Sequence, residues 1–229
     1  GVQTCALPIS TAATPISIDG KELELVSEYK YLGVWITNDL SWSKQIEEMC
    51  KKGNKQIGFI YRRFYQHCSA DTLKHLYTTL VRPHLEYAVP VWDPHLVKHK
   101  DAIERVQKFA LKVCNKDWNS SYSDLLTQAN LPPLAQRRLQ LKLSFLYQLV
   151  NNLSHSNHEL SFRAMPVNVR NNNPYLLSRP SCRTCHYDSS FFPHTISVWN
   201  TLPMSILSSM SLSSFKRAVN KHLCDVYAL

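Results

Sequence analysis

The stretch Leu76 to Trp92 constrains the fold of this chain more than any other segment. It combines two tyrosines, a tryptophan and six leucines or valines with two prolines, so we expect it to be the most buried part of the molecule. Its apolar side chains recur at helical spacing on both sides of Pro83, which predicts a helix that is kinked or briefly broken there. Because a kink redirects the apolar face, the two halves contact different neighbours, as expected of a central element.

Helical periodicity continues on the C-terminal and N-terminal sides of this centre. The sequence predicts amphipathic helices from Trp42 to Phe64, from about Val97 to Cys114 and from Leu134 to Val150. Ser41 is the predicted N-cap of the first, and Ser121 opens a short helix between the second and the third. The expected fold class is therefore mainly α, with a helical bundle as its largest part.

The residues before the first helix alternate apolar and polar side chains, as strands do. Asp19-Gly20 suits the positive φ angles of a tight turn and predicts a β-hairpin. An extended run from Tyr29 to Thr37 predicts one further strand, in which Gly33 allows a bulge or a close backbone approach. The pattern alone is equally consistent with an ordinary small meander and with a functional hairpin.

These changes of pattern divide the chain into segments. The first nine residues, GVQTCALPI, resemble a translated sequencing adapter and are left out of the fold, so we expect the genuine chain to begin further upstream and this chain to be a fragment. The segments that follow are a β-hairpin region (10–41), a helical domain (42–151), a linker rich in Asn, Ser, Pro and His (152–181) and a helical C-terminal segment (182–229).

Composition places the chain among globular intracellular proteins. With 229 residues and 44% hydrophobic content it can bury a core. No apolar run is long enough to cross a membrane, and no secretory signal is visible, so we expect no membrane partner. Seven irregularly spaced cysteines are typical of reduced thiols, which predicts a cytoplasmic or nuclear location or both.

Positive charge is concentrated on the helical part of the chain. The net charge is +9, and residues 44 to 151 hold 17 basic and nine acidic residues. A basic balance of this kind favours a polyanionic partner, although a solvated helix surface is the ordinary alternative. The cations for which we predict phosphate contact are Lys51, Lys52, Lys55, Arg62, Arg63, Lys108, Lys112, Arg137 and Arg138.

The sequence shows no motif for catalysis and only half of one for metal binding. Cys182-x-x-Cys185-His186 has half the spacing of a zinc knuckle, but no second pair of ligands follows at a usual interval, so no metal site is predicted. Motifs for hydrolases, nucleotide-binding loops and adjacent metal-binding aspartates are absent from the sequence. We therefore expect neither a catalytic residue nor a small-molecule substrate in this chain.

Several separated motifs follow one another along the chain in a specific order. They are Tyr29-Lys30-Tyr31-Leu32-Gly33-Val34, Asp39-Leu40-Ser41-Trp42, Leu76-Tyr77, Val81-Arg82-Pro83-His84-Leu85-Glu86-Tyr87-Ala88, Val91-Trp92, Ile103-Glu104-Arg105-Val106-Gln107-Lys108, Leu134 with Arg137-Arg138, Ser190-Phe191-Phe192-Pro193, Trp199-Asn200-Thr201-Leu202-Pro203 and Phe215-Lys216. Together they resemble one family, the reverse transcriptases of non-LTR (LINE-type) retrotransposons, most closely the CR1, L2 and jockey branches. The resemblance covers nearly all of the chain from Ile16 onward. Cysteines or histidines stand at 182, 185, 186 and 194, where arginines are expected, which is consistent with a degenerate genomic copy.

The resemblance implies a role in the polymerase for each segment of the chain. Residues 10–41 would be the end of the polymerase palm, with Tyr31 and Gly33 near the primer terminus, and residues 42–151 the thumb that grips the template and primer. The aspartates that bind magnesium would lie in a palm that is absent here, so we expect no cofactor and no polymerase activity from this chain alone. The implied partners are RNA and RNA:DNA or DNA duplexes, bound through phosphates. The alternative is a basic helical protein-interaction module that binds no nucleic acid.

Overall fold

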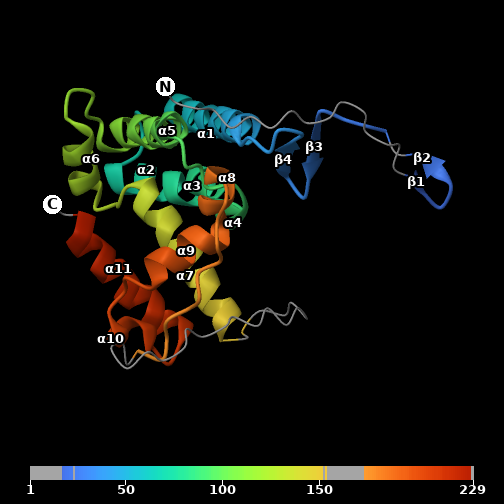
Figure 1. Ribbon diagram of the computed structural model, residues 1–229. Helices are drawn as coiled ribbons and strands as arrows, with labels where there is room; N and C mark the ends of the chain where they lie inside the picture. Colours follow the sequence, from blue (N-terminus) through green and yellow to red (C-terminus); the bar gives the residue numbers. More distant parts are fainter. Residues whose placement is uncertain (1–16, 23, 152, 154–172, 228–229) are drawn as a thin grey trace, which may run out of the picture.

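The computed structural model describes residues 17–22, 24–151, 153 and 173–227, and it is mainly helical (Figure 1). Two small hairpins come first and the helices follow, which confirms the expected fold class. In Figure 1 the hairpins extend to one side, the helices α1 (Ser43–Phe64) and α5 (Val97–Asn115) lie side by side along the top, and most of the C-terminal helices form the lower part.

The first hairpin forms as the sequence predicts. Strand β1 (Ser17–Ile18) pairs with β2 (Lys21–Glu22) in an antiparallel register. Asp19 and Gly20 connect them with φ angles of 51° and 75°, both in the left-handed region that a two-residue hairpin turn requires.

The second hairpin corrects the prediction of a single strand from Tyr29 to Thr37. Strand β3 (Glu28–Tyr31) pairs with β4 (Val34–Thr37), and Leu32-Gly33 is the turn between them. Both turn residues have positive φ angles, 45° and 86°. Glycine adopts a positive φ without steric cost, but leucine does not. Leu32-Gly33 is therefore not a typical hairpin-turn sequence, and the turn could not be recognised from it.

This second hairpin is fastened to the helices. Gln45 of α1 accepts a hydrogen bond from the backbone N–H of Trp35 at 3.0 Å, and the hydroxyl of Tyr87 donates to the carbonyl of Leu32 at 2.8 Å. The side chain of Val34 is buried against the helical core. The hairpin therefore holds a fixed position beside the N-terminal half of α1.

Helix α1 has nearly the predicted bounds, but Ser41 does not cap it. The N-cap position is Trp42, whose side chain makes no capping hydrogen bond. Midway along α1, a Cβ atom at Gly53 would lie 3.0 Å from Val106 of α5 and 3.3 Å from Leu85. Gly53 thus allows α1 to approach two other helices closely.

The central stretch is a chain of short helices with a kink and a break. Around Pro83 the helix widens: the N–H of Arg82 donates to the carbonyl of Tyr77, five residues earlier, which accommodates a proline that has no N–H of its own. The break comes later, where Tyr87 is extended and Ala88 has a φ of 54°. The elements are α2 (Ala70–Leu76), the π-helix η1 (Tyr77–Val81), α3 (Arg82–Glu86) and α4 (Val89–Trp92).

Helices α1 and α5 run parallel to one another. Near their first turns, Ser43 Oγ lies 3.3 Å from His99 Nε2, and beyond their last turns Trp118 Nε1 donates to the hydroxyl of Tyr65 at 3.3 Å. Two further helices follow α5, α6 (Tyr122–Ala129), which is capped by Ser121 as predicted, and α7 (Leu134–Val150).

The C-terminal segment packs against α7. Residues 154–172 of the predicted linker lie outside the described residues, but 173–181 are not a free linker, because Leu176 and Leu177 are buried. The side-chain amide of Asn200 exchanges two hydrogen bonds with the backbone of Leu177, at 3.0 and 2.9 Å. The helices here are α8 (Cys185–Asp188), α9 (Phe191–Trp199), α10 (Met204–Leu207) and α11 (Leu212–Tyr227).

The buried side chains form two main cores that share one helix. The first surrounds the fully buried Trp92 and includes Leu134 at the start of α7. The second surrounds Trp199 and Phe215 and includes Leu143 from the second half of α7. The C-terminal segment is therefore joined to the helical domain through α7. Among the helices of the described residues, none has the length and apolar character needed to cross a membrane.

Candidate nucleic-acid interface

The tip of the second hairpin and α1 enclose a small groove. Gly33 and Trp35 of the hairpin line it together with Lys52 of α1 and with His84 and Tyr87 of the central stretch, around a volume of about 70 Å³. Tyr31 is 59% exposed next to the hairpin turn. Of the two residues predicted to lie near a primer end, Gly33 is thus brought to the part of α1 where Lys52 is found, and Tyr31 ends the strand before the same turn.

The predicted cations of α1 are exposed, and most are free of acidic partners. Lys51 is the exception, because its ammonium lies 2.7 Å from the carboxylate of Glu47 and 3.1 Å from that of Glu48. The other four have no acidic group within ion-pair distance in the part of the chain that the structure describes; they are Lys52, Lys55, Arg62 and Arg63, and we call them the α1 cation row.

The predicted cations of α5 are half-buried. Lys112 donates from its ammonium to the carbonyl of Trp118 at 2.9 Å, which fixes the loop after the helix. Lys108 lies one turn earlier and has no ion-pair partner among the described residues. Both retain some exposure to solvent, so they extend the positive charge from α1 to its parallel neighbour.

Arg137 and Arg138, for which we predict phosphate contact, do not belong to an exposed basic face, because each is held in an ion pair. Arg137 makes a bidentate pair with Glu86 at 2.6 and 2.8 Å. Arg138 is 1% exposed, and its Nε donates to Asp93 at 2.9 Å. Two consecutive cations of α7 therefore bind Glu86, which ends α3, and Asp93, which follows α4. These ion pairs connect α7 to the chain on both sides of the break at Ala88.

Asp93 is the centre of a buried cluster with more positive than negative groups. Its second carboxylate oxygen lies 2.5 Å from the ammonium of Lys142, whose side chain is 4% exposed. Glu104 accepts from the backbone N–H groups of Leu134 and Ala135 at 3.2 and 2.7 Å, so it caps α7. The cations of the cluster are Arg82, Arg137, Arg138 and Lys142, and its anions are Glu86, Asp93 and Glu104.

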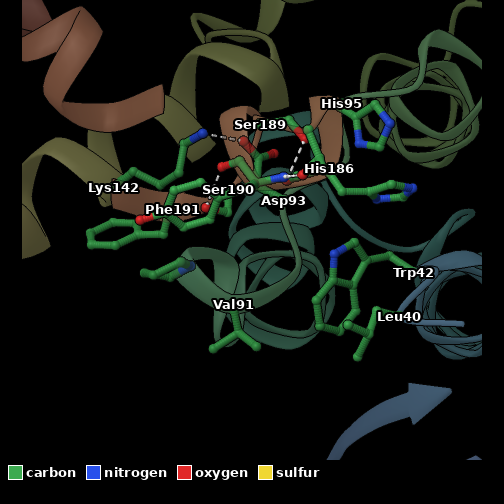
Figure 2. Close-up of a pocket in the computed structure, with 13 residues that line it drawn as sticks. Leu40, Trp42, Val91, Asp93, His95, Lys142, His186, Ser189, Ser190 and Phe191 are labelled. Carbon is green, nitrogen blue, oxygen red and sulfur yellow. Dashed lines mark hydrogen bonds and ion pairs between the residues drawn. The ribbon is translucent and has the colours of Figure 1, made fainter. Parts of the chain in front are cut away.

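A pocket of about 390 Å³ opens beside this cluster, between the start of α1, the end of α4 and the C-terminal segment. Figure 2 shows Lys142 and Asp93 joined at its inner wall, with Trp42 and Phe191 on either side of Val91. Sequence reasoning missed this pocket, because Asp93 and Lys142 lie far apart along the chain and neither belongs to a local motif.

Burial lowers the pKa of three histidines near the pocket, His194, His95 and His99. The pKa of His194 is lowered first by burial and then by the charge of Lys142, whose ammonium lies 3.3 Å from its Nδ1. Burial is also the largest cause that lowers the pKa of His95 and His99. The ring of His95 meets that of His186 edge to face, with centroids 5.5 Å apart.

The half zinc motif is not completed within the described residues. No three histidine, cysteine, aspartate or glutamate side chains gather there in a way that could hold a metal ion. The thiol of Cys182 donates instead to the carbonyl of Pro180 at 3.3 Å, and burial raises its pKa. Cys185 is exposed as a free thiol.

Comparisons with known proteins do not assign this chain to a family. No family model matches the chain, and neither the curated proteins nor the solved structures contain a significant match.

Proposed function

We propose that this chain is the end of the palm and the thumb of a non-LTR retrotransposon reverse transcriptase, and that it grips a nucleic-acid duplex through backbone phosphates. The observation that carries the proposal is the α1 cation row, four exposed cations without acidic partners in the described residues, of which Lys52 lies beside the hairpin tip. Unpaired surface cations are free to replace the counterions that surround a polyanion.

The spacing of the α1 cation row suits a phosphate backbone. From Lys52 to Arg63 the helix rises about 16 Å, at about 1.5 Å per residue. Successive phosphates of one strand of B-DNA are about 3.4 Å apart along the axis, so the row spans about five of them. The ammonium and guanidinium groups of the row would contact phosphates and not base edges in a groove of the duplex. We therefore expect binding without sequence preference. An RNA:DNA hybrid would be recognised by its shape.

The catalytic step lies outside this proposal. The chain has no adjacent aspartates for a magnesium-dependent nucleotidyl transfer, so its part in the reaction is to hold the template and primer while a separate palm performs the chemistry. A nucleic-acid-binding protein with free cysteines fits the cytoplasm or the nucleus, which is the location that we propose.

The test is a titration of an RNA:DNA hybrid duplex at several salt concentrations, followed by fluorescence anisotropy. Neutralising Lys52, Lys55 and Arg63 to Gln is expected to lower affinity and to reduce the slope of log K against log salt by about 0.9 for each phosphate that the variant no longer neutralises. The matched control neutralises Lys216, Arg217 and Lys221 of α11, three exposed cations on a distant helix with the same total charge.

Each result decides between two interpretations. A smaller slope in the α1 variant with an unchanged slope in the α11 variant supports a localised phosphate interface. Equal reductions of the slope in both variants would show that binding depends on the net charge of the chain and not on the position of the α1 cation row. Absence of salt-dependent binding by the parent chain would leave the α1 row as a solvated surface and favour a protein-interaction module.

A further inference from the structure

The pocket beside Asp93 combines a buried polar wall with aromatic side walls. The polar wall is the ion pair of Lys142 and Asp93, which sits at the inner end of the pocket (Figure 2). The aromatic groups are Trp42 before α1, Tyr187 of α8 and Phe191 of α9. Two buried charges of opposite sign and three aromatic rings therefore face one cavity.

The ion pair leaves a donor and an acceptor available side by side. Lys142 has three ammonium protons; one is directed to Asp93 at 2.5 Å and His194 lies within 3.3 Å, so a third remains for another partner. The two oxygens of Asp93 accept from Arg138 and Lys142, and each keeps a second lone-pair site. A ligand that fits this wall presents an acceptor next to a donor on one edge.

The aromatic groups restrict the ligand further. Flat rings stack on the side chains of Trp, Tyr and Phe, and bases bind such surfaces regardless of their sequence. A nucleobase is planar and has acceptors and donors side by side on its Watson–Crick edge. It therefore matches both the polar wall and the aromatic walls.

We propose that this pocket binds one unpaired nucleobase, with its edge at Lys142 and Asp93 and its face on the aromatic side chains. The proposal rests on the proposed nucleic-acid function and names a second contact for it. Trp42 immediately precedes α1, so the pocket lies at the N-terminal end of the helix that carries the α1 cation row. A nucleic-acid strand that leaves the duplex near the N-terminal end of α1 would place an unpaired nucleotide at the pocket.

The experiment is calorimetric titration of the full chain with adenosine, guanosine, cytidine and uridine. Val91 lines the pocket and is 54% exposed, so Val91→Trp fills the cavity without removing a polar group. Val97→Trp is the matched control, because Val97 is 69% exposed at the start of α5 and does not line the pocket. We expect saturable binding of at least one nucleoside by the parent and by Val97→Trp, and affinity lower by at least about tenfold in Val91→Trp.

A second variant tests the stacking contact. Tyr187 is 47% exposed, and its hydroxyl makes no hydrogen bond that the fold needs among those of the described residues. Tyr187→Ala is therefore expected to fold and to weaken nucleoside binding about 5- to 150-fold, the range for one base–aromatic contact. Unchanged binding in both Val91→Trp and Tyr187→Ala, or no saturable binding by the parent, would overturn the proposal.

Duplexes with and without a single-stranded overhang separate the source of the base. If the overhang raises the affinity of the parent but not that of Val91→Trp, the base comes from a strand; if only nucleosides bind, it comes from a free nucleoside. Neutralising the α1 cation row leaves the pocket intact, so this variant should bind the duplex more weakly and still bind nucleosides. Nucleoside binding by a parent chain that shows no salt-dependent duplex binding would refute the proposed function alone. Retained duplex binding with no nucleoside binding refutes the pocket alone.

Discussion

At the scale of single residues, Asp93 is the acid that neutralises two buried cations. Its carboxylate contacts both Arg138 and Lys142, whose side chains are 2% and 4% exposed. A buried cation without a counter-charge is strongly unfavourable, because it loses its hydration and gains no compensating interaction. The position of α7 against α4 therefore depends on this acid.

Replacing Asp93 by Asn tests that dependence. The amide keeps the shape and removes the charge, so two buried cations lose their partner and the free energy of unfolding is expected to fall by about 3 to 5 kcal/mol. Urea denaturation followed by circular dichroism measures the change. Asp101→Asn, an exposed acid on α5, is the control and should change stability by less than about 0.5 kcal/mol. A decrease below about 1 kcal/mol for Asp93→Asn would show that the cluster is hydrated.

At the scale of elements, the sequence predicts periodic helices well and non-local pairs poorly. The bounds of α7 follow from its apolar spacing, and the kink at Pro83 follows from the missing N–H. Pro90, in the first turn of α4, likewise accounts for a break before it, but the sequence does not show that the break falls at an alanine with positive φ.

The candidate site shows the same division. Lys52 and Lys55 are exposed as the face of α1 predicts, since residues opposite the apolar stripe of an amphipathic helix reach solvent. Arg137 and Arg138 are not on such a face, and the sequence did not indicate this because their acidic partners lie 51 and 45 residues earlier in the chain. The pocket around Lys142 was missed for the same reason, since its walls come from segments far apart in the sequence.

The two glycines of α1 provide a prediction about helix packing. Gly53 faces Val106 and Leu85 at short range, whereas a Cβ at Gly58 meets only the flexible end of Arg62, at 3.3 Å. Gly53→Leu is expected to destabilise the protein by about 1 to 3 kcal/mol, because it forces α1 away from α5. Gly58→Leu should instead gain up to about 1 kcal/mol from helix propensity. Thermal unfolding of the two variants compares them directly, and equal effects would place the close crossing elsewhere.

At the scale of the whole molecule, α7 couples the two cores. Its first half packs in the core around Trp92 and its second half in the core around Trp199. A rigid helix that contributes to both transmits a loss of packing from one to the other, so the two cores should not unfold independently.

Phe215→Ala tests this coupling. Phe215 is fully buried in the second core and stacks on Tyr147 with ring centroids 4.4 Å apart, so its truncation should cost about 3 to 5 kcal/mol. Hydrogen exchange under native conditions is then expected to quicken at Ile103 in the first core as well as at Leu146 in the second. Faster exchange confined to the second core would show that the cores are separate folding units.

The sharing of α7 also sets an order of events during synthesis on the ribosome. Asp93 is made well before its cationic partners on α7, so the first core is incomplete until that helix has emerged. When it has, Leu143 and Leu146 in its second half are still uncovered, because Trp199 and Phe215 have not yet been translated. The nascent chain therefore passes through a stage with an exposed apolar helix face, and this is the stage at which a chaperone would bind and at which aggregation would begin.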